Sequence, residues 1–167
     1  MSNTINKEKT GKKHILPTDW QPVHIQRLWN HWSTMENKGE YFSYQCGPGV
    51  VAFLHCTGRL KGKVLDYGCG PGFLIEYLLM RNVKCWGADV NPEAVKNTKR
   101  KYESHANFNG CLQLDGLPSP IATDSFDVVT CIETLEHLDD HTLHQVVDDV
   151  YRIVKPGGVA LFTTPFN

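Results

Sequence analysis

The residues with the clearest chemical potential lie in the stretch CIETLEHLDD, which spans residues 131–140. His137 has a reference pKa near neutrality and is the obvious candidate for a catalytic general base; a histidine on the surface at a helix end is the alternative interpretation. Glu133, Glu136 and His137 are spaced i, i+3 and i+4, which places them on one face of a helix or of a turn leading into one. Two carboxylates and an imidazole so placed could hold Mg²⁺ or another divalent cation, with a site that holds no metal as the favoured alternative. Such a cation would lower the pKa of a coordinated hydroxyl.

A second candidate is the glycine-rich segment VLDYGCGPGF, which follows a short apolar run. Glycines at alternate positions allow a tight turn and the close approach of a ligand to the backbone, and here they are Gly68, Gly70 and Gly72. The dinucleotide pattern is G-x-G-x-x-G, and this spacing departs from it. Pro71 removes one N–H that would bind phosphate, and the Asp66 carboxylate would repel a pyrophosphate. The loop therefore predicts a nucleoside-like ligand with a positive group and disfavours an NAD-dependent oxidoreductase.

Two aspartates follow the next apolar runs. Asp89 ends the run VKCWGADV, 19 residues after Gly70. A carboxylate there can accept hydrogen bonds from both hydroxyls of a ribose, and capping the next helix is its alternative role. Asp115 ends the run CLQLD and precedes Gly116, so its side chain can reach the exocyclic amine of an adenine. A simple turn residue is the alternative interpretation of Asp115.

Strands alternate with helices from residue 61 onward. The expected strands cover residues 63–68, 83–90, 111–115, 125–133 and 159–164, and the expected helices cover residues 73–81, 92–102 and 142–154. This alternation implies an α/β fold with right-handed crossovers, a doubly wound and mostly parallel sheet covered by helices on both faces. Ligands bind such sheets beyond the carboxyl ends of the strands, where the glycine loop and the aspartates fall.

The chain before residue 61 is expected to add N-terminal helices to this sheet. The polar residues 1–16 predict a disordered tail, and residues 17–60 predict a helical cap or lid. Helices are expected over residues 22–35 and 47–58, and residues 61–167 are expected to form the ligand-binding α/β domain.

Aromatic residues of this cap are candidates for covering the ligand. Trp29 and Trp32 lie at helical spacing, which favours plain packing over a role in a lid. Tyr41 and Tyr44 are expected in a loop-like segment, from which a hydroxyl could reach the ligand.

The composition of the 167 residues is that of an ordinary soluble globular protein. The formal net charge of −1 predicts no global attraction to nucleic acid or to an anionic membrane. No apolar stretch approaches the roughly 20 residues needed to cross a bilayer, and the lysines near residue 1 are not followed by the apolar core of a secretory signal. Six scattered cysteines without a C-x-x-C pair argue against a zinc knuckle and for reduced thiols in a cytoplasmic protein.

Four motifs carry a family resemblance. LDYGCGPG with Asp89, then LDGLPSPIATDSFDVV and VKPGGVALFTTP, resemble in order and spacing the class I S-adenosylmethionine-dependent methyltransferases, over residues 45–167. The resemblance implies a Rossmann-like methyltransferase fold with S-adenosylmethionine as cofactor. It also implies a cofactor site: Asp66, Gly68, Cys69 and Gly70 around the methionine part, Asp89 at the ribose, Val90, Asn91, Asp115 and Gly116 at the adenine, and Cys131 near the sulfonium.

The stretch ending in His137 is similar to one in ubiquinone-pathway O-methyltransferases and in small-RNA 2′-O-methyltransferases. Both accept substrates with adjacent oxygens, which a metal can chelate. The RNA enzymes need a further histidine downstream, and none follows His144. O-methylation of a small-molecule acceptor is therefore the favoured function, with a metal-assisted RNA 2′-O-methyltransferase as an alternative.

The family's sheet has seven strands, whereas this sequence stops at Asn167, just past the fifth expected strand. A fifth strand without a neighbour exposes unpaired backbone. We expect either a fragment of a longer protein or an edge covered by a partner or by a second copy in a homo-oligomer. A cofactor-binding module without turnover is the alternative function that this ending leaves open.

Overall fold

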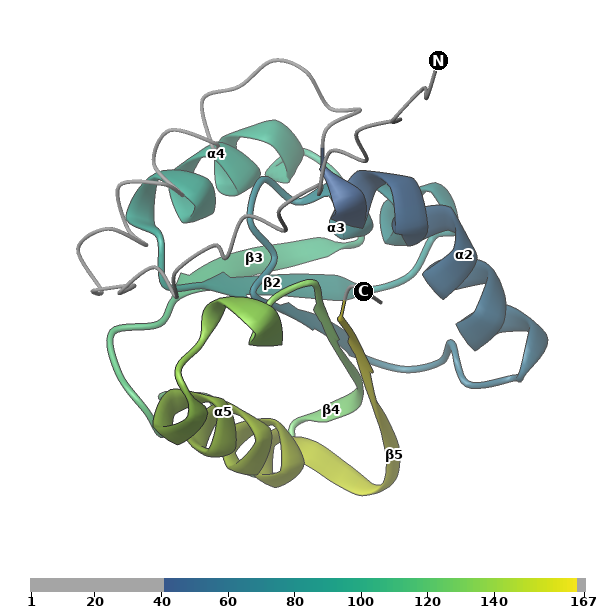
Figure 1. Cartoon of the computed structure of the whole chain (residues 1–167). Helices are drawn as coiled ribbons and strands as arrows, with labels where there is room; N and C mark the ends of the chain where they lie inside the picture. Colours follow the sequence, from purple (N-terminus) through teal and green to yellow (C-terminus); the bar gives the residue numbers. More distant parts are fainter. Residues whose placement is uncertain (1–40, 165–167) are drawn as a thin grey trace, which may run out of the picture.

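A five-stranded parallel sheet forms the centre of the computed structural model, which describes residues 41–164 (Figure 1). The strands lie in the order β3-β2-β1-β4-β5, and every neighbouring pair is parallel. Their bounds are β1 (Val64–Tyr67), β2 (Cys85–Asp89), β3 (Phe108–Gln113), β4 (Phe126–Ile132) and β5 (Val154–Thr163). The strand order reverses beside β1, because the chain first continues outward to β3 and then returns to β4 on the other side. The predicted doubly wound α/β sheet is confirmed.

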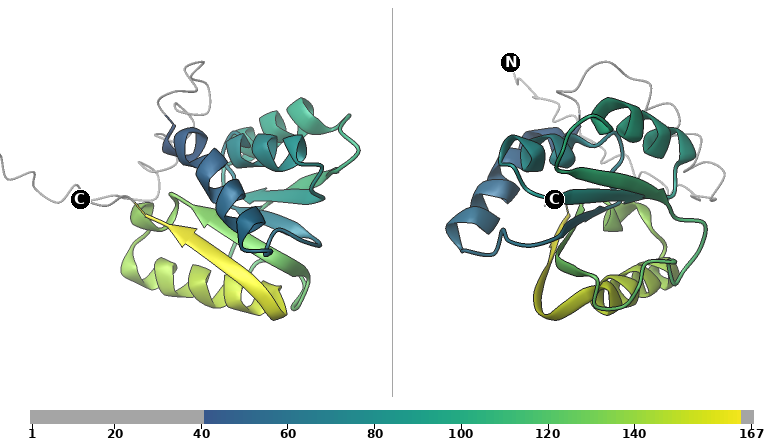
Figure 2. Two further views of the ribbon diagram at one scale, coloured as in Figure 1. Left: turned by 90° about the vertical axis from the view of Figure 1, so that its right-hand side faces the viewer. Right: turned by 180° about the vertical axis from the view of Figure 1, so that it is seen from behind.

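Helices cover both faces of this sheet, as Figures 1 and 2 show. On one face lie α2 (Phe42–Cys56), α3 (Phe73–Met80) and α4 (Pro92–Tyr102). The other face carries α5 (Asp140–Ile153) and the short 3₁₀ helix η2 (Leu135–His137). Among the described residues, no helix is both long and apolar enough to cross a membrane.

The core consists of two apolar layers, one on each side of the sheet. Successive side chains of a strand point to opposite faces, so Val64 packs in the layer beneath α2 and α3, and Leu65 packs in the layer against α5. Both side chains are essentially fully buried. This double burial explains why the central strands contain consecutive apolar residues, such as Val64 and Leu65, and not an alternation of apolar and polar ones.

Three elements begin three or more residues away from their sequence-based start. Helix α2 begins at Phe42 and continues through Gly47 and Pro48, so Tyr44 is helical and the expected loop there is wrong. The physical reason is tertiary packing: a Cβ at Gly47 would lie 2.6 Å from a ring carbon of Tyr77, so glycine lets α2 approach α3 closely.

The other two differences are at the strands of the sheet edges. Strand β3 runs from Phe108 to Gln113, three residues earlier at its start than expected, because Phe108 packs beside Tyr102 of α4. Strand β5 starts at Val154, directly after α5, and includes the KPGG segment that was expected to separate helix from strand. A register shift in its pairing with β4 accommodates these residues. The expected helix over residues 22–35, with Trp29 and Trp32, lies outside the described residues.

Candidate functional site

The glycine loop connects β1 to α3 in a backbone conformation that favours glycine. Gly68, Gly70 and Gly72 have φ values of 78°, 48° and 78°, in the left-handed region. The N–H groups of Gly68 and Cys69 both donate to the Ala88 carbonyl of β2, at 2.7 and 3.0 Å. The loop is therefore folded over the end of β2, with its backbone close to the carboxyl edge of the sheet.

Two residues of α4 hold the loop from behind, and sequence reasoning missed both. Thr98 donates its hydroxyl to the Gly70 carbonyl at 3.0 Å, and Tyr102 donates its hydroxyl to the Gly72 carbonyl at 3.0 Å. Thr98 lies four positions after Ala94 and four before Tyr102, on the buried face of a helix whose other face is basic. A buried polar residue on that face was the signal that could have found it.

Asp89 joins the loop to the end of β2. One carboxylate oxygen accepts the Gly70 N–H at 2.7 Å, and the other accepts the Asn91 N–H at 2.8 Å. The Val90 N–H is a further backbone donor to this carboxylate, whose two oxygens offer about four acceptor positions in all. Burial raises the pKa of Asp89, and the backbone N–H donors partly oppose that shift.

The cap of helix α4 is Asn91 rather than Asp89. The Asn91 side-chain oxygen accepts the N–H groups of Glu93 and Ala94, at 3.0 and 3.3 Å. Capping, the alternative role considered for Asp89, is thus already performed by another residue. The amide nitrogen of Asn91 is buried and has no hydrogen-bond acceptor among the described residues. Beside it, the Val90 side chain is 65% exposed and offers an apolar surface at the same edge.

The sequence predicted Asp115 as the last residue of its strand. In the structure, Asp115 lies two residues beyond the end of β3. Leu114 donates its N–H to the Asp89 carbonyl at 2.9 Å, which holds this segment next to the end of β2. The Asp115 carboxylate is exposed and accepts a hydrogen bond from the Gln113 amide at 2.8 Å. A Cβ on Gly116 would meet nothing within 4 Å, so open space borders this segment.

Asp66 is a buried carboxylate on β1, and only 3% of it is exposed. One of its oxygens accepts the Thr130 hydroxyl of β4 at 3.0 Å. Burial raises its pKa from 3.8 to about 7, with the Thr130 hydrogen bond opposing and the nearby Asp89 charge adding to the shift. A cation beside Asp66 would stabilise the ionised form, which suits a ligand with a positive group.

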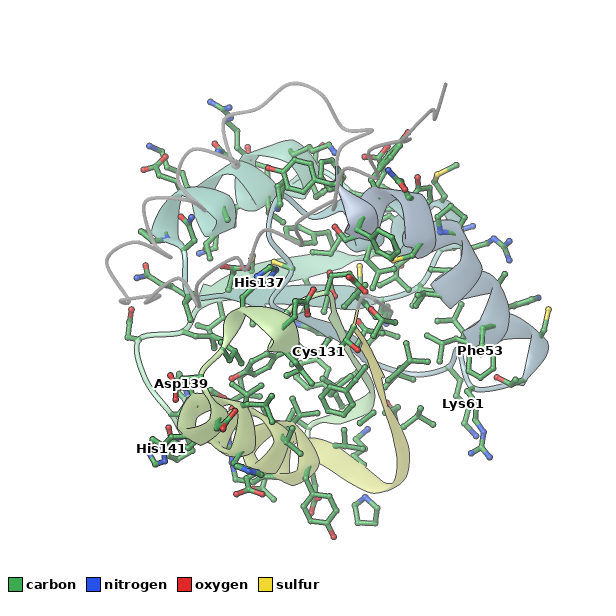
Figure 3. All side chains as sticks on the ribbon, viewed as in Figure 1. Phe53, Lys61, Cys131, His137, Asp139 and His141 are labelled. Carbon is green, nitrogen blue, oxygen red and sulfur yellow. The ribbon has the colours of Figure 1, made fainter. Side chains whose placement is uncertain are left out.

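The end of β4 carries the residues expected to act in catalysis (Figure 3). Cys131 is fully buried, in the apolar layer that faces α5, and burial raises the pKa of its thiol to about 12. His137 ends η2, and its Nε2 lies 3.6 Å from a Glu136 carboxylate oxygen. Burial lowers the pKa of His137, which favours the neutral imidazole, and burial is also the main cause that raises the pKa of Glu136 to about 7.

The described residues contain no group of three His, Cys, Asp or Glu side chains arranged to hold a metal ion. The predicted set of Glu133, Glu136 and His137 relied on helical spacing. Glu133 instead has a φ of 51° and precedes the 3₁₀ turn, with its N–H donated to the Thr163 hydroxyl at 3.1 Å. The i, i+3, i+4 geometry is therefore not formed, and the structure does not support the predicted divalent cation.

The aromatic residues before α3 pack against its first turn. The centroids of the Tyr41 and Tyr44 rings lie 4.7 and 5.4 Å from the centroid of the Phe73 ring, and both contacts are edge-on. Burial raises the pKa of Tyr41 to about 12. Both tyrosines therefore pack against Phe73, the first residue after the glycine loop.

A doubly wound parallel sheet with a glycine loop and an acidic residue at the ends of its first two strands defines the Rossmann-like class of nucleotide-binding domains. Within that class, residues 65–162 match the family model described as "Methyltransferase domain", and the chain belongs to this family. The resemblance to class I S-adenosylmethionine-dependent methyltransferases is confirmed at this level.

Curated relatives and solved structures agree with this membership. The chain is 35% identical over 95 residues to the ubiquinone biosynthesis O-methyltransferase of Psychrobacter cryohalolentis, a match that covers 54% of this chain and 36% of the relative. It is 51% identical over 41 residues to the enzyme of the same name from Pseudomonas putida, which covers 25% of this chain and 17% of that one. The chain thus matches only about a third or less of the length of these relatives.

Among solved structures, the magnesium protoporphyrin IX methyltransferase of Synechocystis PCC 6803, determined with bound SAM, has a TM-score of 0.55 and 25% identity. The match covers 66% of this chain and 54% of that one. It supports the Rossmann-like methyltransferase fold.

Proposed function

We propose that this chain is the cofactor-binding part of an S-adenosylmethionine-dependent methyltransferase that methylates an oxygen of a small molecule. The observation that carries the proposal is the Asp89 carboxylate at the end of β2. It is held in place by backbone N–H groups, among them those of Gly70 and Asn91, and a carboxylate has about four acceptor positions in all. Two adjacent ribose hydroxyls supply the two donors that such a carboxylate needs.

The residues around Asp89 fit the rest of this cofactor. A Cβ at Gly70 would meet nothing within 4 Å, so the loop borders open space that a ligand can fill against bare backbone. The buried Asn91 amide lacks an acceptor, and an adenine ring nitrogen supplies one. Asp66 favours a positive group, because burial makes an uncompensated carboxylate there unfavourable. These residues are the ones that would hold the ribose, the adenine and the methionine part.

The cofactor supplies, when bound, a methyl group on a cationic sulfur that is already a strong methyl donor. The chain's residues then have to orient the acceptor oxygen and remove its proton. His137 is the proposed base, since its lowered pKa keeps the imidazole neutral and able to accept a proton near pH 7. Its place after β4 is at the same edge of the sheet as the glycine loop.

The choice of an oxygen acceptor rests on the names of two relatives and not on a feature of the site. The two ubiquinone biosynthesis relatives are O-methyltransferases by name, and both match this chain over a minority of their own length. A metal-assisted reaction on RNA is not favoured, because the described residues present no three-residue metal group.

Isothermal titration calorimetry tests the proposal directly. The protein is titrated with S-adenosylhomocysteine and, separately, with NADH. The expected result is selective binding of S-adenosylhomocysteine. Selective binding of NADH would overturn the proposal. Tight cofactor binding without methylation of any catechol or other hydroxyl acceptor would favour a binding module without turnover.

A further inference from the structure

Two buried thiols meet at the glycine loop. The Sγ atoms of Cys69, in the loop, and Cys111, on β3, lie 3.5 Å apart. The exposed fractions of these residues are 7% and 5%, and neither cysteine forms a disulfide in the structure. The pair therefore links the loop to the far side of β2 through a direct sulfur–sulfur contact.

Gly87 of β2 creates the space in which the two sulfurs meet. A Cβ at this position would lie 2.8 Å from the Cys69 Sγ and 2.9 Å from the Cys111 Sγ. Any larger residue at Gly87 would push the thiols apart. The two sulfurs consequently meet next to the Gly87 backbone of β2.

The two sides of this contact differ in how easily they can move. Cys111 lies within β3, where it pairs with Gly87 in a parallel ladder. Cys69 lies between Gly68 and Gly70, whose backbones occupy the left-handed region. Since a disulfide brings two sulfurs to about 2.05 Å, bond formation requires them to approach by about 1.5 Å. The glycine loop with Cys69 is therefore the part expected to move when the bond forms.

Movement of the loop acts on the carboxylate at the end of β2. The Gly70 N–H is held by Asp89 at 2.7 Å, and the Gly70 carbonyl is held by the Thr98 hydroxyl at 3.0 Å. A shift of Cys69 toward β3 displaces the neighbouring Gly70 and disturbs both hydrogen bonds. The site that would bind the ribose is thereby altered.

We propose that Cys69 and Cys111 form an oxidation site, at which a hydroperoxide produces an intramolecular disulfide that weakens cofactor binding. One thiolate attacks the peroxide, whose O–O bond breaks, and a sulfenic acid and one water result when the oxidant is hydrogen peroxide. The second sulfur then attacks the sulfenic sulfur, the S–S bond forms, and the hydroxyl leaves as a second water. Both thiol protons end in water, and the peroxide is the species reduced.

The environment of the pair makes this reaction slow in the resting protein. The hydrogen bond between the Cys69 and Cys111 thiols, followed by burial, raises the pKa of Cys69 well above that of an ordinary thiol. Since the thiolate is the reactive form, little of it is present near neutral pH. An exposure of hours to the oxidant is therefore the appropriate experimental range.

The experiment uses the full chain, first reduced and then treated with hydrogen peroxide. Peptide mapping by mass spectrometry, without any ligand, is expected to detect a Cys69–Cys111 cross-link. Calorimetry is expected to show at least a tenfold weaker affinity for S-adenosylhomocysteine after oxidation, restored by dithiothreitol. Only this second readout rests on the proposed function. If the reduced protein does not bind S-adenosylhomocysteine, the proposed function fails, whereas the map still decides whether the oxidation site exists.

Two variants serve as matched controls. Cys111→Ser removes one thiol of the pair, and its affinity is expected to be unaffected by peroxide; Cys111→Ala replaces it if the serine variant does not fold. Cys56→Ser removes an exposed thiol and is expected to respond like the wild type. An oxidised wild-type protein without the cross-link, or a cross-linked protein with unchanged affinity, would overturn the proposal.

Discussion

Replacing Asp89 by alanine is expected to abolish most cofactor affinity. The carboxylate is the proposed acceptor for the two ribose hydroxyls, which lose their partner in this variant. Hydrogen bonds to charged groups contribute about 1.5–3 kcal/mol each. The loss is therefore about 3–6 kcal/mol, which corresponds to a roughly 10²- to 10⁴-fold weaker affinity.

The same substitution also affects the protein itself. The Gly70 and Asn91 N–H groups lose their acceptor, at a cost of about 1–3 kcal/mol each where they stay buried. Asp127→Ala is a suitable control, because it removes a carboxylate that accepts the Lys63 N–H at 2.8 Å and pairs with Lys155. Asp127 lies at the start of β4, away from the proposed site.

Calorimetry with S-adenosylhomocysteine, below the melting temperature of each variant, measures the affinity. Thermal unfolding identifies variants that are not folded at that temperature. The control is expected to lose stability but to bind as the wild type does. An Asp89→Ala protein that is folded and binds within about threefold of wild type would refute the ribose assignment.

Four further outcomes are expected. Gly70→Ala and Gly157→Ala both place a side chain at positive φ in open space, which costs about 1–2 kcal/mol of stability; only the Gly70 variant should lose affinity in calorimetry, and equal affinities would contradict this. His137→Ala should lower kcat about 10²- to 10⁴-fold with unchanged cofactor affinity, and unchanged kcat would exclude it as the base. Burial holds the pKa of Asp66 near 7 instead of 3.8, so its protonated form stabilises the fold at low pH and this contribution is lost as pH rises from about 4 to 7; Asp66→Asn should flatten that decline in Tm, and a parallel decline would count against it. Methyl transfer should proceed equally with and without EDTA, and an EDTA-sensitive rate restored by Mg²⁺ would reinstate a metal.

The central strands could be predicted from the sequence because burial on both faces leaves a plain signature. Leu65 and Val129 face one apolar layer while Val64 and Val128 face the other, so β1 and β4 contain consecutive apolar residues. The edge strands lack this signature. Strand β3 is only partly buried and contains Asn109 and Gly110, and its bounds were therefore misplaced.

Helix α2 shows where local propensity failed. Glycine and proline at positions 47–49 are unfavourable inside a helix, and the helix was therefore expected to begin at Gly47 and not at Phe42. Here the contact between Gly47 and the Tyr77 ring decides the conformation, and Tyr77 is 30 residues away in the sequence. No local pattern contains that information.

The candidate site was predictable in its backbone and less so in its side-chain contacts. The glycine loop and Asp89 follow from spacing alone, and the structure places them within one hydrogen bond of each other. The supporting hydroxyls of Thr98 and Tyr102 come from a helix that reads as a solvated basic surface. The metal set failed because a left-handed backbone at Glu133 breaks the helical spacing on which it depended.

A crystal structure of the protein with S-adenosylhomocysteine would show directly whether Asp89 binds the ribose. We expect both ribose hydroxyls to lie about 2.5–3.0 Å from the oxygens of Asp89, with the methionine part along the glycine loop near Asp66. A ligand bound elsewhere, or a ribose that makes no hydrogen bond to Asp89, would contradict it.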